Sequence, residues 1–557
     1  MKTSKFLFCI LAYLMFVSGF IRAQILIPDY AINFLAGNED EIQKSLVDRN
    51  GNLYLVGMFK SNQLIFGTDT LLRSGENDIF LVKLDADTNV VFAKSFKNWG
   101  LSKVTGIVLD SYSNIYLSGY SQGSLTFDTF ILYGNSYSNC SFVVKMNPDA
   151  EVIWANSYAG GSSSCSMVID SADNIYISGW FAQTFIINNI HTTIYPTNSN
   201  LHFLLKIDAS GSEKWLKNYG GELMIDKQQN LFFTDNYSDS IRMDDHLLTT
   251  ISNEENHNLY VAKADTNGHV LWAKKFCEGE HALFNNAIID TLTNTILITG
   301  TFKTDSLTFD SHIIRNHGYS DLFIAKIDTA ANVLMAKSYG SINADYSYGL
   351  TRISPEYMAL LGTSNGDSIY FDNYLLEGGS ANQTGRSDFF IVIIDNYGNP
   401  IWARNFPGSS GQTFQSIIAD GKDNVFVAGD FCSSTDANKV KTVTSSVLTS
   451  IEPTFIEQPS LYLVKFKLGN ATGNLINNHT DPISLYPNPA NSHLNIKIED
   501  QSNTFTLDIY NIEGKCMIRK ALVSGINSLD IRLLPKGIYL VQVESNNNRI
   551  SKKFIKN

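Results

Sequence analysis

The chain has 557 residues, of which 44% are hydrophobic and 17% are charged, with 38 glycines. This balance is typical of a folded, turn-rich β protein and excludes a disordered chain. The net charge is −12, and the stretch between the two basic ends is more acidic still, which argues against nucleic acid as a partner because phosphate backbones would be repelled.

The first element in chain order is a leader. Two lysines precede an uncharged apolar run from Phe6 to Phe20, and a small residue, Ala23, comes before Gln24. This order predicts a cleaved signal peptide over residues 1–23. A transmembrane anchor is the weaker alternative because the run is shorter than the ~20 apolar residues that span a bilayer. A lipoprotein anchor is weaker too, because Cys9 lies inside the run.

The following region contains a repeat of about 62 residues in which three short sequence patterns recur in a fixed order. The first pattern usually ends in glycine, as in DSADNIYISG (Asp170–Gly179), and has a weaker copy in DKQQNLFFTD (Asp226–Asp235). The second is FLVKLD at Phe80, and the third is WANSY at Trp154. The first two patterns occur seven times, whereas only six copies of the third follow them.

The missing copy of the third pattern is YAINF (Tyr30–Phe34), which lies ahead of the first repeat. Each repeat is predicted to form four strands, joined by turns in which Asp and Asn bond the local backbone. Four-stranded sheets repeated radially are the blades of a β-propeller. We therefore predict an all-β chain in which residues 24–468 form a seven-bladed β-propeller closed by the N-terminal strand. A linear solenoid is the alternative, but it would need polar caps at both ends.

The repeat also resembles that of secreted bacterial β-propeller-repeat proteins, which have similar NxYxxG, FVAKLD and WA signatures. The resemblance covers about residues 30–467. It implies the propeller fold and says little about a ligand, because propellers host many unrelated functions.

The longest connections in most repeats join the second and third strands and lie on one face of the predicted propeller. Variable loops on a rigid scaffold usually carry binding sites. Five aromatic residues on this face are candidates for stacking on sugar rings: Trp99, Tyr120, Trp180, Phe302 and Phe431. The alternative is that these rings pack beneath the connections as core.

No motif of a known catalytic, metal or cofactor site is present, so we expect no catalytic residue, no metal and no cofactor. CEGEH (Cys277–His281) groups several possible metal ligands, but no second cluster accompanies it. The cysteines are sparse and scattered; a Cys140–Cys165 disulfide and two buried thiols both remain open.

A polar linker (469–482) leads to a tail (483–557) whose alternating pattern predicts a small β-sandwich. The tail closely resembles the type A C-terminal sorting domain of the bacterial type IX secretion system. The residues that match are Tyr486, Pro487, Asn488, Pro489, Gly514, Gly537, Tyr539, Lys552 and Lys553. The resemblance implies that this domain binds the secretion machinery and that the protein passes through the periplasm, to be secreted or anchored on the outer surface.

Two hypotheses for the propeller follow. The first is a non-catalytic binding or adhesion module for a glycan or protein, which long Ser-, Thr- and Asn-rich loops without a catalytic signature favour. The alternative is an extracellular hydrolase acting on polysaccharide, because the two carboxylates of a glycosidase can lie anywhere on a propeller.

Overall fold

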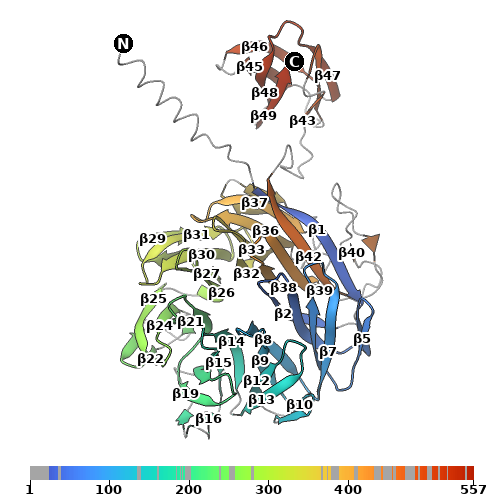
Figure 1. Ribbon diagram of the computed structural model, residues 1–557. Coiled ribbons are helices and arrows are strands. Elements are labelled where there is room, and N and C mark those ends of the chain that lie inside the picture. Colours follow the sequence, from blue (N-terminus) through green and yellow to red (C-terminus); the bar gives the residue numbers. More distant parts are fainter. Residues whose placement is uncertain are drawn as a thin grey trace, which may run out of the picture. The chain divides into compact units, whose positions relative to one another are not determined.

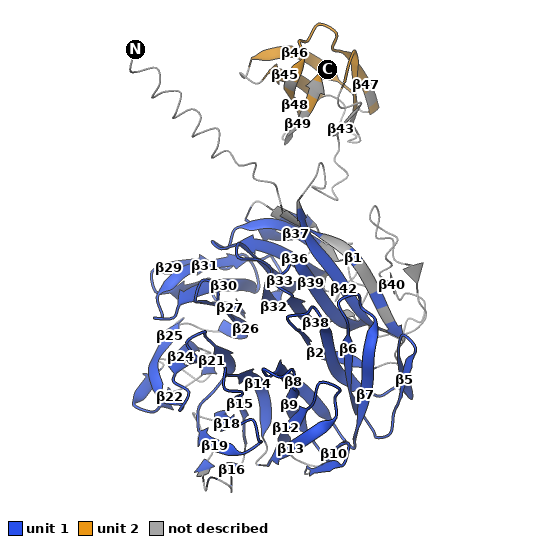
Figure 2. Ribbon diagram, viewed as in Figure 1, with its two compact units in different colours: residues 1–470 blue, residues 471–557 orange. Residues whose placement is uncertain are grey.

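The computed structural model divides the chain into two compact units, residues 1–470 and 471–557 (Figure 2). It describes residues 24–35, 39–134, 139–159, 162–182, 185–187, 190, 192–194, 202–237, 240–249, 258–276, 282–365, 368–372, 374–377, 388–406, 412–431, 441–442, 454–455, 460–470, 483–486, 490–498, 505–511, 515–523, 525–545 and 548–556. The regular elements in these ranges are all β-strands, which confirms the all-β prediction, and no helix there is long and apolar enough to cross a membrane.

Each repeat contributes antiparallel strands to one sheet, and the described residues of the larger unit form seven such sheets. The first strands are β2 (Glu41–Val47), β8 (Ser102–Leu109), β14 (Ser163–Ile169), β20 (Glu222–Ile225), β26 (Ala282–Asp290), β32 (Asp345–Arg352) and β38 (Gln412–Ala419). The second strands are β3 (Leu53–Phe59), β9 (Ile115–Ser121), β15 (Ile175–Trp180), β21 (Leu231–Tyr237), β27 (Thr295–Phe302), β33 (Tyr357–Ser364) and β39 (Asn424–Phe431).

The third strands are β6 (Asp78–Leu84), β12 (Cys140–Met146), β18 (His202–Ile207), β24 (Asn258–Ala264), β30 (Asp321–Asp328), β36 (Asp388–Asp395) and β42 (Ser460–Asn470). The fourth strands are β7 (Val90–Asn98), β13 (Val152–Tyr158), β19 (Glu213–Lys217), β25 (Val270–Phe276), β31 (Val333–Tyr339) and β37 (Pro400–Phe406), with β1 (Gln24–Leu35) in the last sheet.

The turns between first and second strands form because an Asp side chain bonds the backbone beyond it. Asp170 Oδ1 accepts the N–H of Asn174 at 2.8 Å and that of Ala172 at 3.0 Å, while Asp173 takes a φ of 60°. Asp and Asn tolerate this left-handed conformation and supply the local bonds, which explains their recurrence at the turns.

The strand β1 pairs with β42 of the last repeat, although the two lie at opposite ends of the larger unit's sequence. The antiparallel register runs from Gln24 opposite Asn470 to Leu35 opposite Ser460. The segment Tyr30–Phe34 falls within this pairing, so it is a fourth strand supplied from the N-terminal side.

The sheets pack against one another around a common centre (Figure 1). Each first strand contacts the first strand of the next sheet, and β38 contacts β2. Seven hydrophobic clusters each combine residues of two consecutive sheets. One of them joins the last sheet to the first through Phe34 and Leu461 on one side and Leu53 and Phe80 on the other.

The connections between second and third strands hold short two-stranded hairpins. They are β4 (Gln63–Phe66) with β5 (Asp69–Leu72), β10 (Ser124–Phe127) with β11 (Phe130–Tyr133), β16 (Phe185–Ile187) with β17 (Thr192–Ile194), β22 (Ser240–Met243) with β23 (His246–Thr249), β28 (Ser306–Phe309) with β29 (His312–Arg315), β34 (Ser368–Phe371) with β35 (Tyr374–Glu377), and β40 (Lys441–Thr442) with β41 (Thr454–Phe455). Several hairpins fasten onto the preceding sheet, as in the ion pairs Lys274–Asp310 at 2.7 Å and Lys337–Asp372 at 2.8 Å. These ion pairs attach the hairpins to the scaffold.

The smaller unit consists of two sheets around its own core. One contains β43 (Ile483–Tyr486), β44 (His493–Ile498) and β47 (Gly525–Asp530); the other contains β45 (Phe505–Asn511), β46 (Cys516–Leu522), β48 (Gly537–Ser545) and β49 (Asn548–Lys556). Buried Ile496, Leu507 and Val541 belong to one hydrophobic cluster shared by both sheets.

Candidate functional site

The end of the second strand carries glycine in most repeats because the first strand passes close to it. A Cβ on Gly179 would lie 2.2 Å from the carbonyl oxygen of Ser163, and one on Gly57 would lie 1.9 Å from that of Glu41. Real Cβ atoms do not approach so closely, so these positions exclude any larger residue.

The fourth repeat reverses this arrangement. Asp235 stands at the glycine position, and the glycine appears instead in the facing strand segment as Gly221, where a Cβ would lie 2.5 Å from the Thr234 carbonyl oxygen and 3.2 Å from the Asp235 Cβ. Because glycine has moved to the facing segment, the fourth repeat has space for the Asp235 carboxylate at a position where the other repeats have glycine.

Asp235 holds a histidine that lies against an exposed tryptophan. The Asp235 Oδ2 is 3.0 Å from His202 Nε2, and the His202 side chain is buried. The His202 and Trp180 rings are 3.9 Å apart between centroids, and Trp180 is 42% exposed. Trp180 thus has one side supported by protein while much of its surface is open to a ligand.

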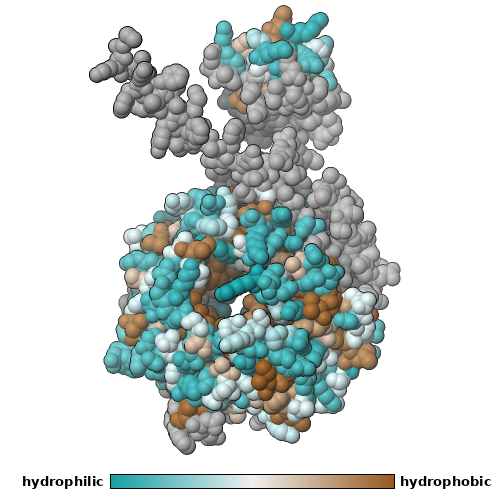
Figure 3. Space-filling model, viewed as in Figure 1, coloured by the Kyte–Doolittle hydropathy of each residue, from teal (hydrophilic) through white to brown (hydrophobic). Residues whose placement is uncertain are grey.

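Other ionisable groups around Asp235 lie on first strands, which face the centre of the larger unit in Figure 1. The space-filling view from the same side shows a hollow at this centre (Figure 3). Burial raises the pKa of Glu222 in β20, with a smaller contribution from the charge of Asp235, while Lys44 and Ser166 oppose the rise. Burial also raises the pKa of the Cys165 thiol well above its usual value, and the carboxylates of Glu222 and Asp235 add to the effect.

The structure separates the five aromatic candidates. Trp99 is 52% exposed, with the Lys97 Nζ 4.7 Å from its ring centroid, and Tyr120 is half-buried. Phe302 is fully buried and packs against Phe323, so the expectation that it faces a ligand is wrong. Phe431 ends β39, but its side chain lies outside the described part. Among the described candidates, Trp180 lies against His202 and thereby belongs to the site around Asp235.

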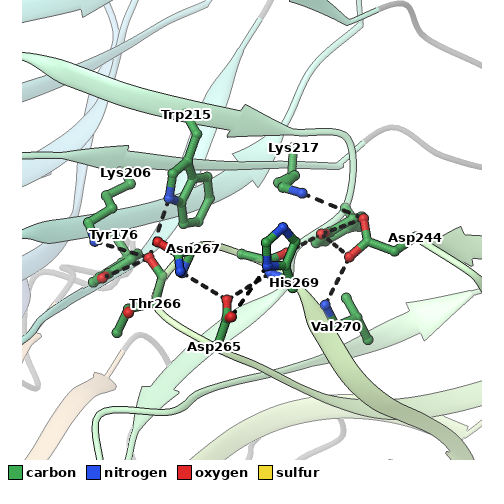
Figure 4. A network of polar contacts seen from close by, with 12 residues as sticks. Tyr176, Lys206, Trp215, Lys217, Asp244, Asp265, Thr266, Asn267, His269 and Val270 are labelled. Carbon is green, nitrogen blue, oxygen red and sulfur yellow. Dashed lines mark hydrogen bonds and ion pairs between the residues drawn. The ribbon is translucent and has the colours of Figure 1, made fainter.

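The recurring Trp and Lys residues of the third and fourth strands hold neighbouring sheets together (Figure 4). Trp215 Nε1 and Lys206 Nζ both donate to the Thr266 carbonyl oxygen, at 3.3 Å and 3.0 Å. Trp154 and Trp272 make the same bond to the turn of the following repeat. These residues therefore connect each sheet to the turn of the following repeat.

Metal ligands and thiols give no further site on the described residues. No group of three or more His, Cys, Asp or Glu side chains there is placed to hold a metal ion, while Cys277–His281 lies outside the described ranges. Cys140 and Cys165 are both free thiols, so no disulfide joins them.

The sorting residues fall into three groups. Tyr539 is buried in β48, where its ring stacks on Phe554 at 5.4 Å and its hydroxyl donates to the Pro535 carbonyl oxygen at 2.8 Å. Four other sorting residues lie in strands: Tyr486 in β43, Gly537 at the start of β48, and Lys552 and Lys553 in β49. Pro487, Asn488, Pro489 and Gly514 lie outside the described residues.

Residues 484–557 match the family model described as the secretion system C-terminal sorting domain. The smaller unit is a type IX sorting tail. This sorting tail indicates export through the periplasm and outer membrane, to the cell surface or beyond. A comparison with curated proteins gives no match.

Several solved structures are similar to the chain at low identity. A Bacteroides caccae protein of unknown function is 8% identical over 68% of this chain and 94% of its own, with a TM-score of 0.31. Apocarotenoid oxygenase from Synechocystis is 7% identical over 69% and 93%, with a TM-score of 0.33. PorZ, a surface component of the Porphyromonas gingivalis type IX system, is 11% identical over 95% and 100%, with a TM-score of 0.15. At these TM-scores no property of these proteins transfers to this chain.

Proposed function

We propose that the larger unit is a seven-bladed β-propeller, closed by β1, which the sorting tail exports and which binds a glycan at the mouth of its central channel without turnover. The continuous series of contacts between first strands, including that of β38 with β2, supports the propeller. The observation that carries the binding function is the exposed Trp180 ring backed by the His202–Asp235 pair.

This arrangement suits a sugar for two physical reasons. The apolar face of a pyranose ring stacks on an indole, and burial of that area stabilises the complex. Carboxylate and imidazole groups accept and donate hydrogen bonds to sugar hydroxyls, and bonds to charged groups are the stronger ones. Asp235 also holds the His202 ring in place behind the indole. Because these side chains are ordered before the ligand arrives, binding costs less conformational entropy.

Replacing Trp180 with Ala is expected to weaken glycan binding at least about tenfold, which corresponds to about 1.4 kcal/mol of lost stacking. A glycan array probed with the chain from Gln24 identifies the ligand, and calorimetry on the best glycan gives the affinities. The Trp99→Ala variant is the matched control, because Trp99 is also exposed but has no supporting His–Asp pair. Equal losses in both variants, or a loss in neither, would contradict the site.

A hydrolase is the second candidate because of Glu222. Burial raises the pKa of this carboxyl while Asp235 supplies a second carboxylate, and glycosidases use such a pair as general acid and base or nucleophile. If the site hydrolyses its glycan, Glu222→Gln is expected to lower kcat by roughly a hundredfold or more with little change in binding. Product formation followed by chromatography on the same glycans decides this point. Binding with no product in the parent chain leaves recognition as the function.

A further inference from the structure

Two repeats differ from the others at the residue that follows the glycine position of the second strand. The second repeat has Tyr120 there and the third has Trp180. The other repeats have no aromatic residue at this position; they have Met58, Asn236, Thr301, Thr363 and Asp430. The sheets of the second and third repeats are neighbours, because β14 contacts both β8 and β9. The two aromatic residues therefore lie in adjacent sheets.

The strand pairing places the two rings at equivalent points of their sheets. Tyr120 in β9 lies opposite Ser141 in β12, and Trp180 in β15 lies opposite His202 in the corresponding strand, β18. Residues that lie directly opposite each other in an antiparallel pair share a face of the sheet. Tyr120 is half-buried and Trp180 is half-exposed, so part of each ring is accessible to a ligand.

A row of polar side chains connects the two aromatic positions. Gln122, two residues beyond Tyr120, donates from Nε2 to Asn139 Oδ1 at 2.9 Å. Asn139 Nδ2 in turn donates to Ser163 Oγ at 2.7 Å. Ser163 lies opposite Trp180 in the pairing of β14 with β15, where directly opposite Cβ atoms are about 5 Å apart. These hydrogen bonds thus cross the boundary between the two sheets and end beside Trp180.

The polar row keeps hydrogen-bonding capacity for a ligand. Gln122, Asn139 and Ser163 are all half-buried. Each side-chain amide nitrogen carries two N–H groups, and the row uses one on Gln122 and one on Asn139. The second N–H of each amide and the Gln122 Oε1 atom can therefore bond to the hydroxyl groups of a sugar.

We propose that the site at Trp180 extends along this row to Tyr120, and that its ligand is an oligosaccharide with one sugar on each ring. The inference rests on the proposed glycan binding and adds the class of ligand. Two rings held by different sheets cannot both stack on a single sugar. A chain of linked sugars reaches both, and its second contact is favoured because the first contact already holds the ligand in place.

The test is calorimetry on the chain from Gln24 with oligomers of increasing length, which have the linkage of the strongest-binding glycan on the array. The affinity of the parent chain is expected to rise at least about tenfold from the shortest oligomer that binds to the longer ones. Tyr120→Ala is expected to remove this gain and to leave the affinity for the shortest oligomer unchanged, whereas Trp180→Ala weakens binding at every length. Tyr120→Phe keeps the ring and is expected to keep the gain.

Two further variants complete the experiment. Gln122→Ala changes neither ring and is expected to reduce the gain about threefold, and it decides the matter if Tyr120→Ala lowers the Tm. Tyr112→Ala is the matched control, because Tyr112 is an exposed tyrosine in the turn between β8 and β9 of the same repeat. It is expected to bind as the parent chain does at every length.

The outcomes separate this inference from the proposed function. If Trp180→Ala weakens binding while Tyr120→Ala and Gln122→Ala both keep the full gain with length, the extension to Tyr120 is overturned and the glycan site at Trp180 stands. If Trp180→Ala binds every oligomer as the parent chain does, or if the parent chain binds none, the proposed function fails and this inference fails with it.

Discussion

Deletion of residues 24–35 is expected to lower the free energy of unfolding of the larger unit by about 5 kcal/mol or more. Leu26 and Phe34 are buried in different clusters, and each loss removes apolar contacts and leaves a cavity. The deletion also leaves β42 as an edge strand with unpaired backbone groups, which favours association between chains. Urea unfolding measures the stability, and gel filtration detects the association.

A permuted variant provides the control for this deletion. Because β1 runs antiparallel to β42, the deleted segment can be reinserted after Asn470 through a short Gly-Ser hairpin. The permuted chain is expected to recover most of the lost stability if β1 serves only as the fourth strand of the last sheet. A deletion variant as stable as the parent chain would favour an open array of sheets over a closed propeller.

The repeat predicts the strands because the residues that define each turn and strand are close together in the sequence. Asp170 and Asn174 make a turn within five residues, and alternation sets which side chains face inward. The repeat does not predict where the hairpins between second and third strands lie, because their position depends on contacts with another repeat. Lys274 and Asp310 are far apart in the sequence, and no local pattern shows that they pair.

The alternation of side chains between the two faces of a strand distinguishes Trp180 from Phe302 among the aromatic candidates. Trp180 directly follows the repeat glycine, whereas Phe302 stands two positions after Gly300. Successive residues of a strand point to opposite faces, so these two rings are expected on different sides of their sheets. The structure agrees, because Trp180 is half-exposed and Phe302 is fully buried.

The repeat pattern does not predict the residues of the candidate site, because Asp235 departs from that pattern. The copy ending in Asp235 looked like a weak match, yet that departure marks where a carboxylate replaces glycine. The pairing of Asp235 with His202 joins two repeats and is visible only in three dimensions. In this repeat array, the polar residue at a position that sterics reserve for glycine is the departure that led to the candidate site.

Replacing Asp345, a buried residue that opens β32, with Asn is expected to stabilise the chain at pH 7.5 by up to about 3 kcal/mol and to change little at pH 4. Burial and the Asp321 charge raise the pKa of Asp345 from its ordinary 3.8 to about 6 in the fold, while Ser341 and Ser364 oppose the rise. A raised carboxyl pKa favours folding below pH 3.8, and this contribution is lost as pH rises through 6. Urea unfolding at pH 4, 5, 6 and 7.5 measures the difference.

Asp78→Asn is the matched control, because Asp78 occupies the same strand position as Asp321 but accepts several N–H donors. An amide at position 78 would point its own N–H group at backbone N–H donors. The Asp78→Asn variant is therefore expected to lose about 1–3 kcal/mol of folding stability at neutral pH. Asp345→Asn is thus expected to raise the stability and Asp78→Asn to lower it. This difference would show that the charge of Asp345 close to Asp321 destabilises the fold, and that burial of a carboxylate by itself does not. An Asp345→Asn variant that is less stable than the parent at pH 7.5 would mean that the protein already compensates this charge.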